Sequence, residues 1–450
     1  MQTLLRNATI VTMDRSHRII DSGGILVEGK SVQRVLSAED LRQMDTSGTD
    51  VVDATGLTVI PGFVQTHIHL CQTLFRGLAD DLELLDWLRL RIFPLEAAHD
   101  ASSMYASARA GLAELIRSGT TTILDMGSVH HEEEVVRAVD ESGIRAFVGK
   151  SMIDINDLYP GLKEPTADAL SSTLRQAGAW HGSGSGRIRY AVAPRFVLSC
   201  SEELLREAYA MTKDFPGMLF HTHAAENRGE MAAVRDRCRM DNIEYFESLG
   251  ILHPNTCLAH CIWLSDWEID LMAERKARVA HCPSSNLKLA SGIANIPGLL
   301  RRGVTVSLGA DGAPCNNTLD MFEEMRLAAL IQKPQHGPGT MDAQTVFSLA
   351  TTGGAAALGV SNEVGSIEAG KRADLVLLDL SRVWNSYAAR PRVDIYSAIV
   401  YGGSPENVHG VMIDGSWVMR NRSLLRVDEA MAVADARQAL RSLLGRVRLP

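Results

Sequence analysis

TVIPGFVQTHIH, residues 58–69, is an apolar and β-branched segment of the kind that forms a buried strand. Seven further segments of this kind follow it, at residues 120–127, 144–152, 188–196, 218–226, 256–264, 277–286 and 304–312. Helical patterns lie between them, such as MYASARAGLAELIRSG at 104–119 and SEELLREAYAMTKD at 201–214. Strands that alternate with helices predict an α/β fold with a parallel sheet, and eight of them predict closure into a TIM-like (β/α)8 barrel.

The two ends of the chain have a different pattern. Short alternating segments, TLLRNATIVTM and GGILVEG among them, occupy the first 57 residues, and similar segments return after residue 360 in VGSIEAGKRADLVLLDL and NVHGVMIDGSWVMRN. We therefore expect a small β-sandwich built from both chain ends. The expected boundaries are residues 1–57 for its first part, 58–362 for the barrel, and 363–450 for its second part with a terminal amphipathic helix.

Composition narrows the class of protein. The 450 residues carry a formal net charge of −9 without a basic run, so nucleic acid is not an expected partner. No stretch approaches the roughly 18–20 apolar residues of a membrane helix, and the first residues lack the pattern of a signal peptide. Seven cysteines without a regular spacing indicate free thiols, and we expect a cytoplasmic protein.

Polar side chains gather at the ends of the predicted strands, where a (β/α)8 barrel places its chemistry. His67 and His69 end the first strand, and their i, i+2 spacing points both imidazoles to one face. Later strands end in further histidines and one aspartate: His221, His223, His260, His281 and Asp311. Imidazole and carboxylate are ligands of a divalent metal such as zinc, so the sequence predicts a metal site at this rim.

Two assignments within this set stay open on the residues alone. A single strand histidine is more often a hydrogen-bonded core residue than a ligand, and alternation along the fifth strand does not separate His221 from His223. We prefer His223 as the ligand, with His221 packed one layer below, because Glu226 follows three residues later and can reach a substrate. His281 is either structural or directly involved.

Four motifs carry a resemblance to a known family. PGFVQTHIH at 61–69, HAAE at 223–226, LAH at 258–260 and SLGADG at 307–312 resemble the amidohydrolase superfamily. The chain is most similar to the subgroup that holds the deaminases of 5'-deoxyadenosine, methylthioadenosine and S-adenosylhomocysteine, guanine deaminase and the triazine hydrolases. The similarity runs from about residue 1 to residue 420 and includes GSIEAGKRADLVLLD at 365–379.

The resemblance implies one divalent metal ion per chain, Zn²⁺ or Fe²⁺, and a single-metal site because no barrel-strand lysine stands where binuclear relatives carry one. The implied metal ligands are His67, His69, His223 and Asp311. His260 would orient a metal-bound hydroxide, and Asp311 would take up the water's proton and pass it to the leaving amine. Glu226 would protonate the ring nitrogen beside the attacked carbon. Relatives are often dimers or larger, so we expect a homo-oligomer that binds a small heterocycle.

The signals on substrate diverge. Gln72, Arg195 and ENRGEMAAV at 226–234 resemble guanine deaminase, whereas LFRGLADDLELLDWL at 74–88, with Trp87, resembles the adenosine-derivative deaminases. Arg195 replaces the histidine that those deaminases usually carry. As alternatives, Arg195 forms a salt bridge in the pocket wall, Gln72 bonds within a loop, and residues 74–88 merely pack at the barrel mouth.

The whole-chain resemblance favours a purine-like nucleoside of the 5'-deoxyadenosine, methylthioadenosine or S-adenosylhomocysteine type. Guanine is the first alternative, and s-triazines and pterins follow. Because chlorohydrolases share the metal ligands, these residues do not separate release of ammonia from release of chloride. A metal-binding relative without catalytic activity would have no reason to keep the complete set of six residues, His67, His69, His223, Glu226, His260 and Asp311.

Overall fold

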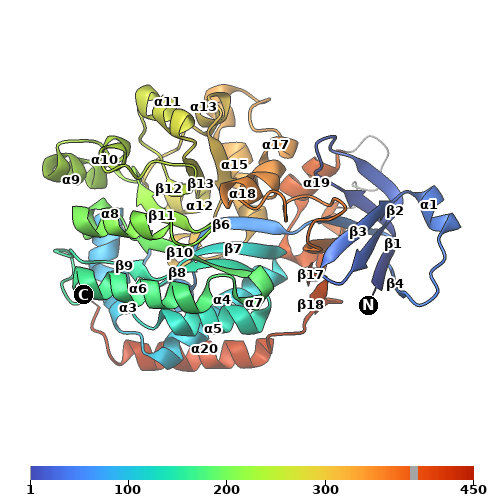
Figure 1. The fold of residues 1–450 in the computed structure, drawn as a ribbon, viewed down its shortest axis with the longest axis horizontal. Coiled ribbons are helices and arrows are strands. Elements are labelled where there is room, and N and C mark those ends of the chain that lie inside the picture. Colours follow the sequence, from blue (N-terminus) through green and yellow to red (C-terminus); the bar gives the residue numbers. More distant parts are fainter. Residues whose placement is uncertain (1, 386–393, 450) are drawn as a thin grey trace.

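The computed structural model describes residues 2–385 and 394–449. Its larger part is a barrel of parallel strands in the predicted order (Figure 1). These strands are β6 (Phe63–His69), β7 (Thr120–Met126), β8 (Arg145–Gly149), β10 (Ile188–Pro194), β11 (Leu219–Ala224), β12 (Thr256–His260), β13 (Arg278–His281) and β14 (Thr305–Leu308). The short β9 (Ser151–Met152) prolongs β8 and pairs with β10. The barrel closes where β15 (Asp311–Gly312) pairs with β6, and this confirms the predicted fold class.

One layer of small and large apolar side chains fills the barrel. Seven strands each contribute one residue to it: Val64, Leu124, Phe147, Ala191, Leu219, Cys257 and Ala280. Residues of α18 (Thr352–Ala357) and the turn after it close this layer from below. Neighbouring residues on the same strands, such as Ile123 and Val148, point outward into the core beneath the helices. The strands are therefore apolar on both faces, as parallel strands buried between two layers require.

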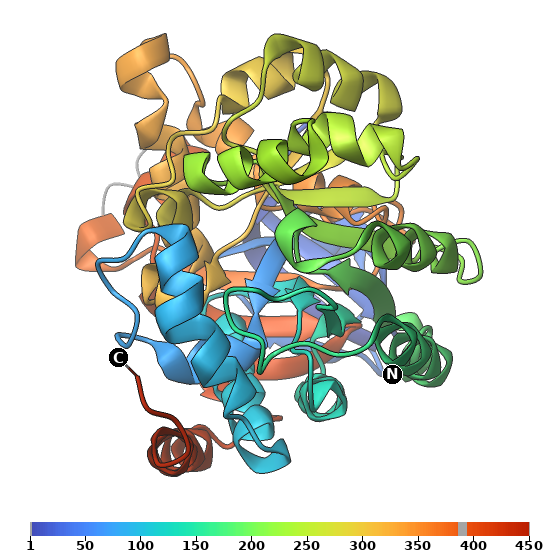
Figure 2. The same cartoon turned by 90° about the vertical axis from the view of Figure 1, so that its left-hand side faces the viewer.

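Helices surround the strands (Figure 2). The main ones are α4 (Ala101–Arg117), α5 (Glu132–Ser142), α6 (Thr166–Trp180), α8 (Glu202–Met211), α11 (Asp266–Arg275), α13 (Ile296–Arg301), α15 (Met321–Ile331) and α17 (Ala343–Leu349). Two more, α9 (Arg228–Cys238) and α10 (Asn242–Ser248), follow β11. The terminal helix α20 (Glu429–Leu444) lies along the barrel next to α4 (Figure 1), and Arg109 on α4 pairs with Asp435 at 3.0 Å.

Strands from both chain ends form one mixed sheet of nine strands. The first part supplies β1 (Gln2–Val11), β2 (Ile19–Glu28), β3 (Ser31–Leu36), β4 (Asp50–Asp53) and β5 (Leu57–Pro61). The second part supplies β16 (Leu375–Asp379), β17 (Val408–Ile413), β18 (Ser416–Arg420) and β19 (Ser423–Leu424). The two parts join where β16 pairs antiparallel with β5. Along β5, Val59 points into the sheet's own core and Ile60 into the core shared with the barrel.

The segment TVIPGFVQTHIH is two strands rather than one. Its first residues belong to β5 in the sheet, and the rest form β6 in the barrel, with Gly62 between them. A Cβ atom at Gly62 would lie 2.1 Å from Oγ1 of Thr121. Only a residue without a side chain therefore permits the chain to pass from the sheet into the barrel here.

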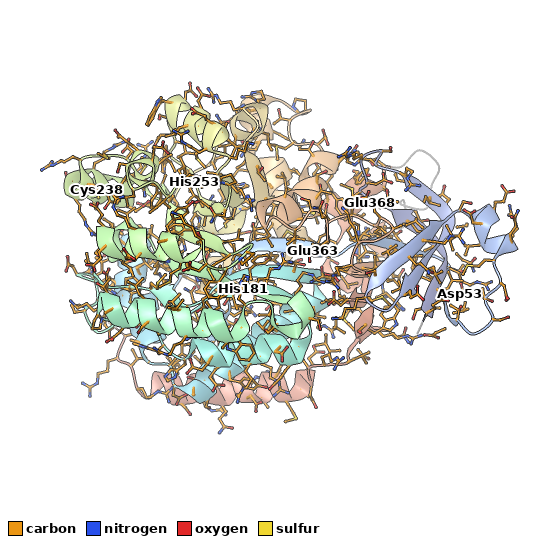
Figure 3. All side chains as sticks on the ribbon, in the orientation of Figure 1. Asp53, His181, Cys238, His253, Glu363 and Glu368 are labelled. Atoms are coloured by element: carbon orange, nitrogen blue, oxygen red, sulfur yellow. The ribbon has the colours of Figure 1, made fainter. Side chains whose placement is uncertain are left out.

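No helix in the described ranges is long and apolar enough to cross a membrane. All seven cysteines are free, and six of them are buried. Cys238, the exception, lies at the outer end of α9 (Figure 3).

A buried ion cluster joins the sheet to the barrel at the amino ends of the strands. Arg145, the first residue of β8, donates two hydrogen bonds to Asp374 at 2.8 and 3.1 Å and also pairs with Asp414. Burial alone would lower the pKa of Arg145, but the two carboxylates raise it above its ordinary value. The sheet thus meets the barrel at the end opposite to the predicted metal site.

We expect Arg145→Met to lower the free energy of unfolding by about 3–5 kcal/mol, because Asp374 would stay buried without its cation partner. Asp414 would keep only its longer pairs with Lys30 and Arg372, at 3.6 and 3.9 Å. Urea denaturation followed by circular dichroism measures this change. Arg89→Met is the control: Arg89 pairs with Asp86 while both side chains are half exposed, so its loss should cost less than about 1 kcal/mol. Equal effects of the two substitutions would contradict a structural role for the buried cluster.

Candidate active site

The structure brings the four predicted metal ligands together at the carboxyl end of the barrel. One ligand atom from each of His67, His69, His223 and Asp311 lies within 4.8 Å of all the others. The Nε2 atoms of His67 and His69 each lie 3.3 Å from Oδ1 of Asp311. β6 supplies two of the residues, β11 one, and β15 the aspartate. The residues thus come from strands that are far apart in sequence and meet only because the barrel closes.

Backbone carbonyls determine which ring nitrogen carries the proton in two of these histidines. Nδ1 of His69 lies 2.7 Å from the carbonyl oxygen of Met126, and Nδ1 of His223 lies 2.6 Å from that of Arg195. A carbonyl oxygen only accepts, so each Nδ1 must donate, and each neutral ring then has a lone pair on Nε2. These two Nε2 atoms face each other at 3.3 Å, which places two lone pairs together.

His67 reaches the same state through a second histidine. Nδ1 of His221 lies 2.9 Å from the carbonyl oxygen of Cys257, so Nε2 of His221 is an acceptor. Nδ1 of His67 lies 2.8 Å from that Nε2 and must donate to it. Nε2 of His67 therefore also carries a lone pair. This atom is buried and has no hydrogen-bond partner among the described residues. His221 lies one layer below the cluster, where it orients His67.

The charge state of the cluster suits a cation. Burial lowers the pKa of His67, and it lowers those of His69 and His223 well below the ordinary value, so these rings are neutral at pH 7. Asp311 adds a carboxylate oxygen, Oδ1, that lies 3.3 Å from Nε2 of both His67 and His69. Three lone pairs and a carboxylate converge without a positive charge. This donor set fits a divalent ion that accepts nitrogen and oxygen ligands.

The turn around Asp311 has a special backbone. Asp311 has a φ of 62°, in the left-handed region, and Oδ1 accepts a hydrogen bond from the Gly312 N–H at 2.7 Å. Before it, Gly309 lies so close to β6 that a Cβ atom would be 2.6 Å from the carbonyl oxygen of His67. The glycines in SLGADG therefore allow β14 and β15 to pack directly against the histidine strand.

Glu226 and His260 lie next to the cluster. Oε2 of Glu226 is 3.5 Å from Nε2 of His260, which in turn is 3.9 Å from Oδ2 of Asp311. Burial, together with the charge of Asp311, raises the pKa of Glu226 well above its ordinary value. This shift favours the protonated form that a general acid requires, and Glu226 lines the same cavity as three of the metal ligands.

A small cavity of about 20 Å³ lies beside these groups. His69, His223, Glu226, His260 and Asp311 line its inner side, and the outer side is formed by Gln72, Leu84, Trp87, Leu88, Arg195, Phe196 and Leu289. Pockets for small molecules usually measure about 300–1,000 Å³, so this one is closed. The apolar cover comes from α2 (Leu84–Trp87) and the π-helical turn that follows it, Leu88–Ile92. A substrate can enter only if this cover moves.

One wall of the cavity contains a buried carboxylate that the sequence motifs did not reveal. Glu96, on α3 (Phe93–Ala97), accepts hydrogen bonds from Nε2 of Gln72 at 2.8 Å and from the guanidinium of Arg195 at 2.7 Å. All three side chains are buried, and the guanidinium lies 5.1 Å from the ring centre of Phe93. Arg195 thus forms a salt bridge in the wall and is also one of the residues that line the cavity.

His281 does not belong to the ligand cluster. It is buried at the end of β13, both ring nitrogens lack a hydrogen-bond partner among the described residues, and burial lowers its pKa to about 3. Its side chain does not line the cavity. The geometry thus supports the structural alternative for this residue.

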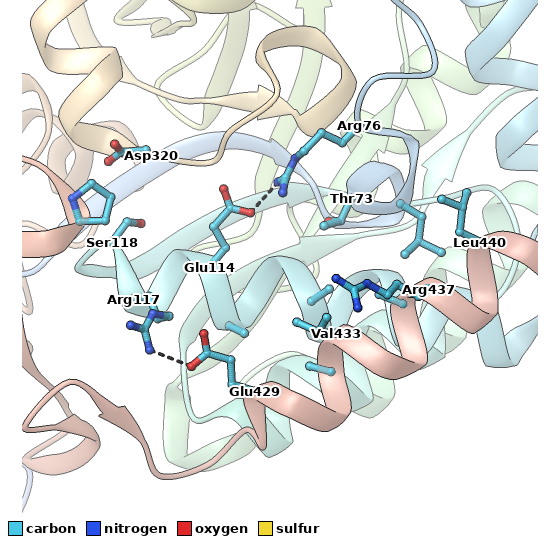
Figure 4. Close-up of a pocket in the computed structure, with 16 residues that line it drawn as sticks. Thr73, Arg76, Glu114, Arg117, Ser118, Asp320, Glu429, Val433, Arg437 and Leu440 are labelled. Carbon is cyan, nitrogen blue, oxygen red and sulfur yellow. Dashed lines mark hydrogen bonds and ion pairs between the residues drawn. The ribbon is translucent and has the colours of Figure 1, made fainter.

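A larger groove of about 520 Å³ lies between α4 and α20, outside the barrel (Figure 4). Four of its charged side chains form two ion pairs, Arg117 with Glu429 at 2.7 Å and Arg76 with Glu114 at 2.5 Å. The groove contains no histidine and no group of residues able to hold a metal. The chemistry of the described residues is concentrated in the closed cavity instead.

Comparison with known proteins agrees with this geometry. A model of the amidohydrolase family matches residues 58–418. The 5'-deoxyadenosine deaminase of Methanothermobacter thermautotrophicus is 41% identical over 433 residues, which cover 95% of this chain and 97% of that protein. The 5-methylthioadenosine/S-adenosylhomocysteine deaminase of Syntrophomonas wolfei is 34% identical, covering 99% and 100%. An adenosine deaminase from Xanthomonas campestris with bound zinc superposes with a TM-score of 0.91 at 30% identity, covering 98% of both chains.

Proposed function

This chain belongs to the amidohydrolase family, and from that membership we propose that it is a metal-dependent aminohydrolase that deaminates a 5'-deoxyadenosine-type nucleoside. The observation that carries the proposal is the convergence of three imidazoles and one carboxylate beside Glu226, a buried glutamate whose pKa is raised. Similarity along the whole chain to 5'-deoxyadenosine and methylthioadenosine/S-adenosylhomocysteine deaminases supports the substrate class.

We propose that His67, His69, His223 and Asp311 hold one divalent ion. The unpartnered lone pair of His67 and the facing lone pairs of His69 and His223 support this assignment. The zinc-bound relative supports Zn²⁺, and Fe²⁺ accepts the same donors. A divalent ion held by these residues would lower the pKa of a water molecule, so that the nucleophile hydroxide would be available at neutral pH.

Two side chains, Glu226 and Asp311, then carry out the proton transfers, and His260 orients the water. Glu226 donates its proton to the ring nitrogen next to the attacked carbon, which removes the negative charge that develops there. Asp311 accepts the proton of the attacking water and passes it to the amino group, which leaves as ammonia. His260 orients the water through its Nε2, which lies between Glu226 and Asp311. As ammonia leaves, the new hydroxyl group on the ring carbon gives its proton to the Glu226 carboxylate, which forms the carbonyl and restores the acid. The net change is the replacement of the amino group by a carbonyl oxygen, with one water consumed and one ammonia released.

Guanine is the second candidate substrate, and one observation favours it. Oε1 of Gln72 is buried in the wall and has no hydrogen-bond partner among the described residues, while Arg195 offers N–H donors beside it. An acceptor next to a donor matches the amide edge of an oxopurine. Pterins carry a similar edge. Trp87, in the cover of the cavity, offers an apolar aromatic ring that suits either heterocycle.

We further propose a homo-oligomer in the cytoplasm. Seven free thiols suit a reducing compartment. Leu425, Met431 and Val433, on α20 and just before it, are about half exposed, which suits a surface covered by a second copy.

The wild-type protein should bind one equivalent of Zn²⁺, and His69→Ala or Asp311→Asn should remove most of it, because each deletes a converging donor. Elemental analysis after dialysis measures the stoichiometry. Glu226→Gln is the matched control, since Glu226 is not among the four donors and the variant should retain its metal. A wild-type protein that binds no equivalent would overturn the proposed centre.

Glu226→Gln should lower kcat/KM by about 10²–10⁴-fold, the usual contribution of a general acid. The pH dependence follows from the raised pKa of Glu226: the group is active while protonated, so kcat/KM should decrease as the pH rises through that pKa. Ammonia release from pH 6 to 10 measures both effects. Unchanged activity in the variant, with metal still bound, would exclude Glu226 as the acid.

A panel assay that follows ammonia and chloride separately should show the highest kcat/KM for 5'-deoxyadenosine or methylthioadenosine among adenosine derivatives, guanine, pterins and s-triazines. Gln72→Leu, which removes the free acceptor, should then affect these nucleosides less than guanine. Faster turnover of guanine that Gln72→Leu abolishes would replace the nucleoside with an oxopurine. Release of chloride from a chlorotriazine in preference to ammonia would replace deamination itself.

A further inference from the structure

Two consecutive buried residues contact the two proton-handling groups of the site. Ser285 and Asn286 follow β13 in the first turn of α12 (Pro283–Lys288). Oγ of Ser285 donates to Oδ2 of Asp311 at 2.6 Å, and Oδ1 of Asn286 accepts from Nδ1 of His260 at 2.8 Å. Neither residue lines the cavity, so both act on the site through another side chain.

Ser285 determines how the Asp311 carboxylate is turned. Oδ1 faces Nε2 of His67 and His69, both at 3.3 Å, while Oδ2 is the oxygen that Ser285 holds. The hydrogen bond therefore keeps one oxygen toward the metal ligands and the other toward His260. Rotation of the carboxylate would exchange these two tasks, and the serine hydroxyl opposes that rotation.

Asn286 determines the tautomer of His260. Its amide oxygen accepts a hydrogen bond from Nδ1, which favours the tautomer with its lone pair on Nε2, between Glu226 and Asp311. A lone pair at this position accepts a hydrogen bond from an attacking water. The other tautomer would donate a hydrogen there and would turn the water's lone pairs away from the substrate.

The backbone around the pair is held firmly. The carbonyl oxygen of Asn286 accepts from the N–H groups of Ser291 and Gly292 at 2.9 and 3.3 Å. Glu324 on α15 accepts from the Ser284 N–H at 3.2 Å and from the Asn316 side chain at 3.2 Å, and burial raises its pKa to about 8. Asn316 also donates to the carbonyl oxygen of Ala310 at 2.6 Å. Glu324 thus ties α12 to the turn that carries Asp311.

We propose that Ser285 and Asn286 form a positioning pair that orients the Asp311 carboxylate and selects the His260 tautomer, so that a single helix turn aligns both groups that handle the water's protons. The proposal rests on the proposed function for the roles of Asp311 and His260. The contacts themselves do not depend on the identity of the substrate.

Ser285→Ala tests the first half, with Ser284→Ala as the matched control, since the neighbouring hydroxyl is also buried but, among the described residues, forms no hydrogen bond to Asp311 or His260. Ser285→Ala should keep one metal equivalent and lower kcat about 10–100-fold, the usual effect of losing a contact behind a metal ligand, with KM nearly unchanged. The visible absorption of the Co²⁺-substituted protein should change as the carboxylate turns. Ser285→Thr, which keeps the hydroxyl, should restore both readouts.

Asn286→Ala tests the second half by ¹⁵N NMR of histidine-labelled protein, with the His260 signals assigned from their loss in His260→Gln. The wild type should show a protonated Nδ1 and an unprotonated Nε2, and Asn286→Ala should show a mixture of tautomers. The proposal is overturned if Ser285→Ala matches Ser284→Ala in cobalt spectrum and kcat, or if the His260 tautomer is the same with and without Asn286. Spectral changes in a protein that releases no ammonia from any substrate would refute the proposed function while the positioning pair stands.

Discussion

The site depends on hydrogen bonds that force lone pairs to face one another. Main-chain carbonyls at Met126, Arg195 and Cys257 only accept, so each requires a proton on the imidazole nitrogen that it contacts. His67 does not contact a carbonyl itself; His221, which does, accepts a hydrogen bond from Nδ1 of His67. The barrel therefore prepares a set of Nε2 atoms that repel one another unless a cation lies between them. Such ligands need no rearrangement when an ion binds, because the strands have already ordered them.

The two ends of the barrel carry different groups: stabilising ion pairs lie at one end, and the candidate active site lies at the other. The amino ends of the strands carry the Arg145–Asp374–Asp414 cluster and the joined sheet from both chain ends, all away from the cavity. The carboxyl ends carry the imidazoles, whose burial lowers their pKa values and keeps them neutral. Buried ring nitrogens without a hydrogen-bond partner, such as Nε2 of His67 and of His260, cost free energy of folding. The ion pairs at the other end stabilise the fold without occupying the site.

The sequence predicts those parts of the fold and the site that have a regular hydrophobic period or a fixed residue spacing. Eight apolar segments predicted the barrel, and His-x-His with the later strand ends predicted which side chains converge, because strand ends of a closed barrel must meet. Glu96 was not predicted, because no residue spacing links a single glutamate in an insertion helix to Gln72 or Arg195. The division of residues 58–69 into the two strands β5 and β6 was not predicted either. Only the contact with Thr121 shows why Gly62 ends one strand and begins another.

The divergent substrate signals in the sequence become one surface in the structure. Gln72 and Arg195, which resemble guanine deaminase, both bind Glu96, and Trp87 from the nucleoside-like insertion covers the same cavity. Glu96 uses its two oxygens on these partners, so it fixes the amide of Gln72 with Oε1 free and leaves other Arg195 donors available. The wall then presents a donor and an acceptor, whereas the cover presents apolar surface. A substrate must satisfy both, and because the closed cavity holds only about 20 Å³, it must first displace the α2 cover.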